Sequence, residues 1–340
     1  GTMLGSWQAT SAFTNARSTW GGSNTTVEGG YIYIMGGCQA VNASGYCTTI
    51  ASDIQLVSIN ADGSLGKWGP ITGLTNSRIG FGLESFQGAI YRIGGCTSQN
   101  SSTGDCSATT ASVDYGEINQ DGDASTVSIT EAPGSGFCVG ADPYDCDLAP
   151  PGDGTGLMGN LLSSSTVING YLYVIGGCVD YDCRNSSGTN GPGSTDVTGN
   201  IGYVKINADG TLRKPATCAG TYYGSWCVDA ANKINGDNGV AAAGVTTFNG
   251  RIYVIGGFDG GSNTNSIFRN DVNDDGSLAG VWAQQSLTGV GATSVAYTYA
   301  YARANPSSAA TNPGNLYIFG GCTSVDNGAG CGGTYSNSTY

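Results

Sequence analysis

The stretch Gly170-Tyr-Leu-Tyr-Val-Ile-Gly-Gly177 decides the fold. Its apolar run is rich in β-branched and aromatic side chains, which favour a buried strand. It begins at the tight-turn dipeptide Asn169-Gly170 and ends at a Gly pair, so the pattern predicts a hairpin before the strand. The same phrase, with its Gly, Tyr and Gly-Gly positions in register, recurs at residues 30–37, 88–95, 250–257 and 314–321.

A second phrase, Asn-x-Asp-Gly, follows every Gly pair except the last, at residues 60–63, 119–122, 207–210 and 273–276. Asp-Gly between two β-like runs is a strong signal for a hairpin turn. Trp68 and Trp282 come soon after two of these turns, and we expect them to anchor the packing of the repeat.

Together the phrases resemble the kelch repeat, in which an apolar strand is followed by a Gly-Gly doublet, a spaced aromatic residue and a Trp. The resemblance covers nearly the whole chain and implies an all-β β-propeller of about five four-stranded blades. Glycine accounts for 58 of the 340 residues and charged residues for only 11%, which fits many short strands joined by tight turns. We therefore expect one propeller domain over residues 1–340.

The spacing of the repeats predicts where the propeller departs from regularity. The Gly-Gly doublets begin at residues 36, 94, 176, 256 and 320, and each of the two longest gaps contains an extra Cys pair. We interpret these gaps as stapled insertions at about 128–158 and 213–238 rather than as further blades. Residues 1–7 are similar to the end of the Asn-x-Asp-Gly phrase, so a strand at 1–9 is predicted to complete the last blade or a neighbour's.

Twelve cysteines fall as neighbours along the chain, each pair closing a short polar loop. Zinc is the competing interpretation, but the chain has no Cys-x-x-Cys pair and no His. We therefore predict disulfides and an oxidising location, extracellular or at a cell surface. The predicted pairs are Cys38/Cys47, Cys96/Cys106, Cys138/Cys146, Cys178/Cys183, Cys218/Cys227 and Cys322/Cys331.

The formal net charge of −13, with only 12 Lys and Arg, argues against nucleic acid and anionic membranes as partners. No run of 18 apolar residues is present, so membrane insertion is not expected. The absence of His removes the commonest general base and transition-metal ligand, so we expect no cofactor apart from the calcium alternative below.

One acidic turn matches the first half of a calcium loop through Asp271, Asn273 and Asp275. The twelfth position of that loop is Trp282, where calcium loops need a bidentate Glu. The same turn recurs in three other repeats, which favours an Asx-stabilised hairpin turn over a Ca²⁺ site.

Two sets of side chains are candidates for ligand binding. Arg17, Arg78 and Arg303 each lie 16–19 residues before a doublet, so they are predicted to occupy equivalent places. They would either grip a carboxylate or acidic sugar through their planar forks, or pair with groups of neighbouring blades. The alternating tyrosines share one strand face and would stack on sugar rings or pack on the next blade; they are Tyr297, Tyr299 and Tyr301.

Asn-x-Ser/Thr sequons predict glycosylated surface loops if the source glycosylates its proteins. They begin at Asn24, Asn42, Asn100, Asn185 and Asn337.

The sequence thus predicts an extracellular, non-enzymatic propeller that acts as a surface, structural or adhesive module and assembles with itself into an array or filament. Its partners would be further copies, other surface proteins or glycans. The alternatives are a carbohydrate-binding, lectin-like propeller and a polysaccharide hydrolase or lyase. A hydrolase would need two carboxylates roughly 5–10 Å apart, and nothing in the sequence pairs two of them.

Overall fold

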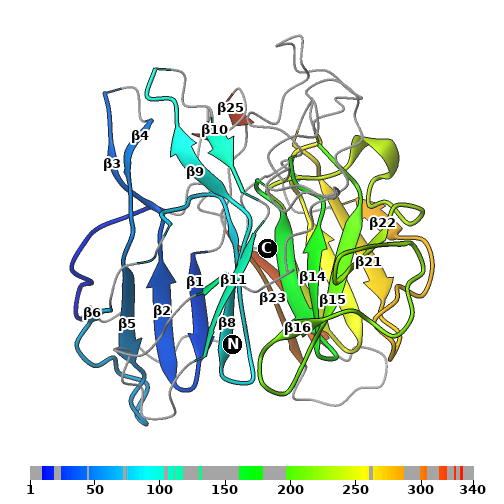
Figure 1. Ribbon diagram of the computed structural model, residues 1–340, viewed down its shortest axis with the longest axis horizontal. Coiled ribbons are helices and arrows are strands. Elements are labelled where there is room, and N and C mark those ends of the chain that lie inside the picture. Colours follow the sequence, from blue (N-terminus) through cyan, green and yellow to red (C-terminus); the bar gives the residue numbers. More distant parts are fainter. Residues whose placement is uncertain are drawn as a thin grey trace.

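The computed structural model describes most of the repeat strands and their turns (Figure 1). The described residues are 10–18, 24–43, 46–71, 74, 76–102, 106–110, 112–117, 130–131, 161–178, 197–259, 263–286, 299–304, 314–319, 325–326 and 330–331. The N-terminal strand predicted at 1–9 and most of the insertion predicted at about 128–158 lie outside them.

Five antiparallel sheets are described along the chain, and the first four start with the tight hairpin that the repeated phrase predicts. The first is ordered β1 (Thr25–Glu28), β2 (Tyr31–Met35), β5 (Ile54–Ser58) and β6 (Gly69–Ile71). The second is ordered β7 (Gly82–Phe86), β8 (Ala89–Ile93), β11 (Val113–Glu117) and β12 (Thr130–Glu131). The fourth is ordered β19 (Gly244–Phe248), β20 (Arg251–Ile255), β21 (Ser266–Asp271) and β22 (Ala283–Ser286). The fifth is described by β23 (Tyr299–Ala304) and β24 (Gly314–Phe319).

The third sheet carries the insertion predicted at about 213–238. Its core strands are β13 (Ser164–Ile168), β14 (Tyr171–Ile175) and β15 (Ile201–Ile206), and the short β16 (Leu212–Arg213) pairs with β15. The insertion adds β17 (Thr221–Tyr223) and β18 (Trp226–Asp229), with β18 paired to β15, and ends near the 3₁₀ turn η3 (Gly236–Asn238). The insertion therefore widens one sheet and does not build a separate blade.

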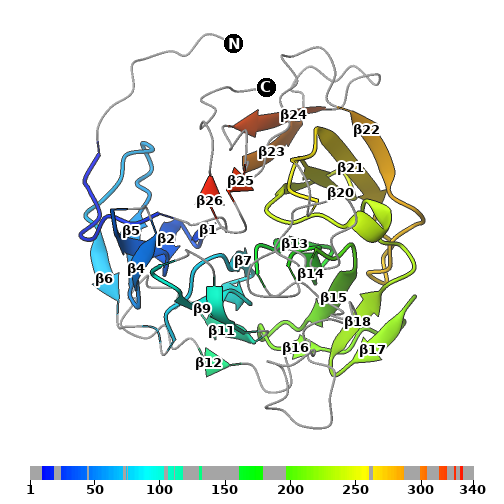
Figure 2. The ribbon, with the colours of Figure 1, turned by 90° about the horizontal axis from the view of Figure 1, so that it is seen from above.

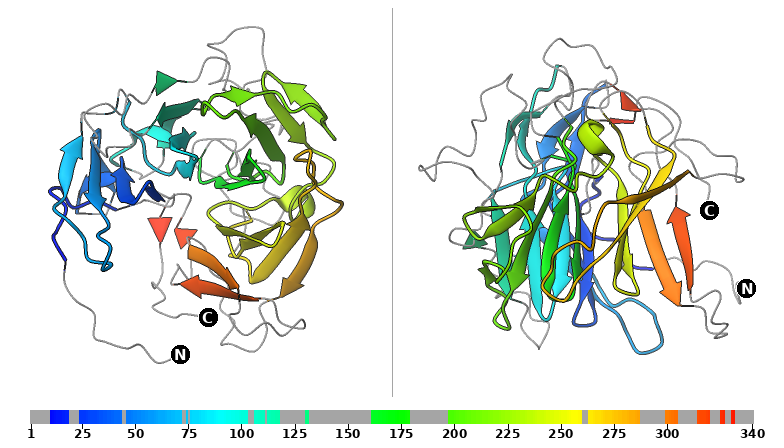
Figure 3. Two further views of the ribbon diagram at one scale, coloured as in Figure 1. Left: turned by 90° about the horizontal axis from the view of Figure 1, so that it is seen from below. Right: turned by 90° about the vertical axis from the view of Figure 1, so that its right-hand side faces the viewer.

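The sheets are arranged around one axis, as a propeller requires (Figures 2 and 3). The first strands of successive sheets contact one another in the order β1, β7, β13, β19 and β23. Apolar side chains fill the spaces between neighbouring sheets; for example, Tyr91 and Ile93 of the second sheet pack with Leu172 and Trp226 of the third. The predicted all-β propeller is confirmed.

Short hairpins extend beyond the propeller at one end, directly after the Gly-Gly doublets (Figure 1). They are β3–β4 (Cys38–Val41, Cys47–Ile50), β9–β10 (Cys96–Gln99, Cys106–Thr109) and β25–β26 (Val325–Asp326, Gly330–Cys331).

The Gly-Gly doublets mark the places where the next sheet's entry segment crosses. Gly37 donates its N–H to the carbonyl of Arg78, and Gly177 donates to the carbonyl of Val240, at 3.1 and 2.8 Å. Gly176 has a φ of 62°, and a Cβ added there would lie 2.0 Å from the Val240 carbonyl oxygen. Only Gly satisfies both the left-handed backbone and this close approach.

The repeated Tyr of the strand phrase locks one sheet to the turn of the next. The Tyr91 hydroxyl donates to the Gly210 carbonyl at 2.7 Å, and the Tyr173 hydroxyl donates to the Gly276 carbonyl at 2.5 Å. Both tyrosines are fully buried, and burial raises the pKa of each hydroxyl, so both remain protonated donors. Gly210 and Gly276 are the glycines of the Asn-x-Asp-Gly phrase, so the two repeated phrases meet across the boundary between sheets.

Removing one such lock is expected to weaken the whole ring. Tyr91→Phe leaves the Gly210 carbonyl without its buried donor and should lower the free energy of unfolding by about 1–2 kcal/mol. The measurement is the denaturant midpoint at neutral pH. Tyr115→Phe is the matched control because its ring stacks on Tyr91 within the same sheet, and equal losses from both variants would contradict the lock.

Candidate functional site

The end of the propeller that carries the hairpins is stapled and packed. Disulfides Cys38–Cys47 and Cys96–Cys106 join the strands of β3–β4 and β9–β10, with Cα–Cα distances of 5.7 and 5.8 Å. Their sulfurs are buried in one apolar cluster together with Cys178, which is also disulfide-bonded. In the fourth repeat Phe258 follows the doublet instead of Cys and fills the same cluster. The staples thus form a shared layer above several blades.

Three of the six predicted Cys pairs are confirmed, and the other three involve cysteines outside the described residues. The confirmed pairs are Cys38/Cys47, Cys96/Cys106 and Cys218/Cys227. The cysteines outside the described residues are Cys138, Cys146, Cys183 and Cys322. The pairs Cys138/Cys146, Cys178/Cys183 and Cys322/Cys331 therefore stay predictions. Of their members, Cys178 is disulfide-bonded and Cys331 ends β26.

Hairpins β3–β4 and β9–β10 lie side by side. Strand β4 contacts β9, and Asn42 Nδ2 donates to the Ser101 carbonyl at 2.6 Å. Their described residues include no Lys, Arg, Asp or Glu, although the chain as a whole carries a net charge of −13. We call this pair the neutral hairpin face; its exposed described positions are Ala40, Val41, Ala43, Thr48, Thr49, Ser98, Asn100, Ser101, Ser102 and Ser107.

Arg17 joins the two chain segments at the base of hairpin β3–β4, which we call the neck of the hairpin. Its Nη1 donates to the Gly36 carbonyl before the hairpin, and its Nη2 pairs with Asp53 after the hairpin at 2.8 Å. The Arg17 side chain is only 1% exposed. Burial acts to raise the pKa of Asp53, but hydrogen bonds from Arg17 and Gln55 outweigh it and hold that pKa below its usual value.

Arg78 closes the neck of the second hairpin in the same way. Its Nη1 donates to the carbonyls of Gly94 and Ser112, which flank the hairpin, and its Nη2 pairs with Asp114 at 3.0 Å. Asp114 also pairs with Arg92, and all three charged side chains are nearly fully buried. Both terminal nitrogens of the Arg78 fork are therefore occupied by groups of its own sheet, and the fork is buried away from an external ligand.

The predicted equivalence of Arg303 with Arg17 and Arg78 is wrong. Arg303 lies inside β23, opposite Asn315, whereas Arg17 and Arg78 precede the first strands of their sheets. The spacing misled because nine residues, 305–313, separate β23 from β24, where other repeats have a two-residue turn. Tyr299 and Tyr301 also lie in β23, opposite Phe319 and Tyr317, and Tyr297 lies outside the described residues.

Glu84 is a carboxylic acid at the seam between the second and third sheets. It lies on β7 opposite Tyr91, at the place that Thr26, Thr166 and Thr246 occupy in three other sheets. Its carboxylate accepts a hydrogen bond from the Ser165 hydroxyl of β13 at 2.8 Å. Desolvation at this seam raises the pKa of Glu84 to about 8, and the bond from Ser165 only partly opposes it.

Glu84 therefore makes stability depend on pH. Because its folded pKa of about 8 lies above the ordinary 4.5, the folded state keeps a proton that the unfolded state loses between these values. The free energy of unfolding falls as pH rises through that window. Glu84→Thr, which restores the repeat residue, should remove this slope and stabilise the protein at pH 9 by at most about 5 kcal/mol.

The measurement is the thermal unfolding midpoint of the parent and of Glu84→Thr at pH values from 5 to 9. Glu28→Thr, a change of the same kind on the neighbouring first strand β1, serves as the control. An unchanged pH slope in Glu84→Thr would contradict the assignment.

The acidic turn proposed for calcium is closed by its own hydrogen bonds. Asp275 Oδ1 accepts the N–H and hydroxyl of Ser277, its Oδ2 accepts the Thr217 hydroxyl at 2.7 Å, and Asp271 pairs with Arg251. The bond from the Ser277 hydroxyl, supported by that from Thr217, lowers the pKa of Asp275 to about 2. The same Asx geometry recurs in the turns that begin at Asn60 and Asn207.

A cation at this turn would have to displace these bonds. Across the described part of the chain, no group of three or more His, Cys, Asp or Glu side chains is placed to hold a metal ion. Calcium binding stays a prediction.

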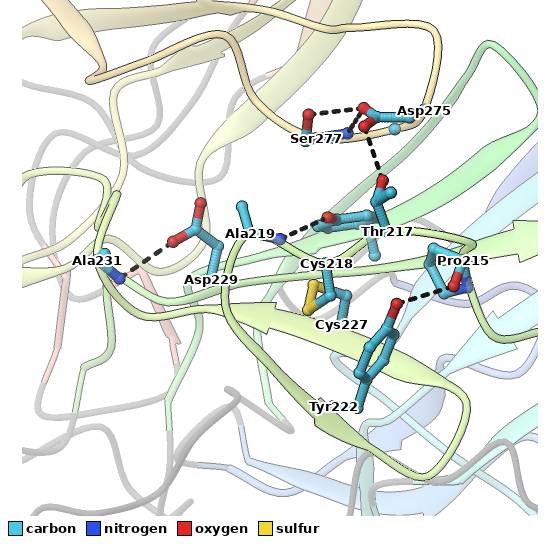
Figure 4. The surroundings of a disulfide bond; sticks show 12 residues. Pro215, Thr217, Cys218, Ala219, Tyr222, Cys227, Asp229, Ala231, Asp275 and Ser277 are labelled. Carbon is cyan, nitrogen blue, oxygen red and sulfur yellow. Dashed lines mark hydrogen bonds between the residues drawn. A yellow bond between two sulfur atoms is a disulfide. The ribbon is translucent and has the colours of Figure 1, made fainter.

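The third-sheet insertion acts as a strap onto the fourth sheet (Figure 4). Disulfide Cys218–Cys227 closes the strap, and Thr217 beside it reaches Asp275 in the turn of the fourth sheet. Trp282 Nε1 donates to the Asn232 carbonyl of the insertion at 3.0 Å. Sequence reasoning located this insertion and its staple, but not the contacts with the neighbouring sheet.

The asparagines of the sequons differ in how exposed they are. Asn24 is only 4% exposed, so the prediction of a surface loop is wrong there. It lies directly before β1, and a Cβ on Gly37 would come within 2.8 Å of its amide nitrogen. Asn42 is half-buried, Asn100 is exposed, and Asn185 and Asn337 lie outside the described residues.

Comparison with known proteins supports the fold. The kelch motif family matches residues 240–269. A solved structure titled "Structure of YjhT" is similar with a TM-score of 0.53 and 15% identity, covering 92% of this chain and 75% of that one. No curated protein matches the chain in sequence. Among the described residues, no helix is long and apolar enough to cross a membrane.

Proposed function

We propose that this kelch-motif propeller is an extracellular, non-enzymatic module that presents its neutral hairpin face to a partner as a structural or adhesive element. The observation that carries the proposal is the way in which that face is built. Two hairpins without described charges are each stapled by a disulfide, clamped at the neck by a buried Arg, and joined through Asn42 and Ser101.

Rigidity favours binding, because a face that is already ordered loses little conformational entropy when it meets a partner. Disulfides are stable in oxidising compartments, which supports an extracellular location. Arg17, Arg78 and Asp275 are held by internal ion pairs or hydrogen bonds, which supports presentation rather than chemistry for these side chains.

A second copy of the chain fits this face on electrostatic grounds. Two molecules of net charge −13 repel each other, and contact through a face whose described residues carry no charge adds little to that repulsion; Asp105, between β9 and β10 in sequence, lies outside the described residues. Self-assembly into an array would follow from repeated use of the face.

Adding charge to the face should weaken self-association. Val41, 57% exposed on β3, is the test position, and Val41→Glu should raise the dissociation constant about tenfold at low salt. Val281→Glu is the matched control, because Val281 is 82% exposed but lies between β21 and β22. Light scattering over a concentration series is the measurement, and a monomer at every concentration would contradict self-assembly.

A carbohydrate partner is the second candidate, since most exposed side chains of the face are hydroxyls or amides that can bond to sugar hydroxyls. Glycan-array binding with and without Ca²⁺ separates the two. Binding that Val41→Glu abolishes favours the lectin function, and no binding under either condition removes it.

A further inference from the structure

The asparagines of three sequons fall among the described residues, and their side-chain amides lie in different surroundings. N-glycosylation needs an asparagine amide that a transferase can reach, with a Ser or Thr hydroxyl two residues on. Asn24 fails, because it is buried and its sequon hydroxyl, Thr26, bonds to Ser85 across the seam between two sheets.

The Asn42 side chain links the two hairpins through a hydrogen bond. Its Oδ1 accepts the Tyr46 N–H at 2.9 Å, and its Nδ2 donates to the Ser101 carbonyl at 2.6 Å. A glycan on this nitrogen would be attached at the contact between β3–β4 and β9–β10.

Asn100 has neither obstacle. It is exposed at the end of β9, and the next two residues, Ser101 and Ser102, are exposed as well. Its Oδ1 accepts the Ser102 N–H at 2.9 Å, so the sequon folds as an Asx turn. This bond engages the oxygen of the Asn100 amide and not its nitrogen, and it brings Ser102 of the sequon close to that amide.

The staple holds this turn out from the propeller. Cys96 and Cys106 bracket the sequon and fix the ends of the hairpin, and Arg78 fixes its neck. The sequon is therefore presented on a rigid support, and a glycan there would project beyond the buried sulfur layer instead of displacing it.

We propose that Asn100 is an N-glycosylation site, and that it is the modified one among the three sequons whose asparagines are described. A glycan there would keep a partner away from the Asn100 end of the neutral hairpin face, so contact through that face would be made by the strand positions around Val41. The inference rests on the extracellular location proposed above. The donor would be a lipid-pyrophosphate-linked oligosaccharide. A bond forms between Asn100 Nδ2 and the anomeric carbon, the bond from that carbon to the pyrophosphate oxygen breaks, the lipid pyrophosphate leaves with the electron pair, and the amide proton passes to a base of the transferase.

The test is glycopeptide mass spectrometry of the full chain secreted by its source or by a glycosylating secretory host. We expect a glycan on the Asn100 peptide and none on the Asn24 peptide of folded, disulfide-bonded protein. Ser102→Ala should abolish the Asn100 glycan. Ser101→Ala is the matched control, because it removes a neighbouring hydroxyl outside the sequon position and should leave occupancy within about twofold of the parent.

The outcomes separate this inference from the proposed function. Secreted, disulfide-bonded protein with an unmodified Asn100 overturns the glycosylation site alone. Reduced protein recovered from inside the cell overturns the extracellular proposal. A glycan on Asn24 of folded protein, or one on Asn100 that survives Ser102→Ala, also contradicts the assignment.

Discussion

The hydrogen bond from a buried tyrosine hydroxyl to the turn of the next sheet is the contact on which this ring depends. Tyr91 and Tyr173 each reach the glycine carbonyl of a neighbouring Asn-x-Asp-Gly turn. The turn offers that carbonyl because Asn and Asp close it from within, and glycine accepts its positive φ and the nearby ring. The second and third repeats thus each supply a donor to their successor, and the doublets leave room for the successor's entry segment. The staples, neck arginines and strap add to a ring whose boundaries are already fixed.

Much of this fold follows from sequence because the interactions are local or repeated. The strand phrase, the Gly pairs and the turns recur in register, and three predicted neighbouring Cys pairs, 38/47, 96/106 and 218/227, are disulfides in the structure. The contacts between sheets are harder to predict, because they join residues far apart in the chain. Arg303 shows this: its distance from the doublet matched the other arginines only because nine residues separate β23 from β24, where the other sheets have two between the corresponding strands.

The disulfides of the candidate site could be predicted from the sequence, but the partners of its buried charged side chains could not. Two signals were visible in the repeat alignment: Arg92 replaces an aliphatic residue of the strand phrase, and Glu84 replaces a threonine. Neither shows from spacing alone whether the charge is paired. In the structure Arg92 is paired with the carboxylate of Asp114. Glu84 instead contacts the neutral hydroxyl of Ser165 across the boundary between the second and third sheets.

The direction of the tyrosine lock has a consequence for how the chain is made. The hydroxyl belongs to the earlier repeat and the carbonyl to the later one, as in Tyr91 with Gly210 and Tyr173 with Gly276. During synthesis from the N-terminus, a blade leaving the ribosome has its donor in place but waits for the next turn to be translated. The second and third blades are therefore completed by their successors, and these two boundaries are formed in the order of translation.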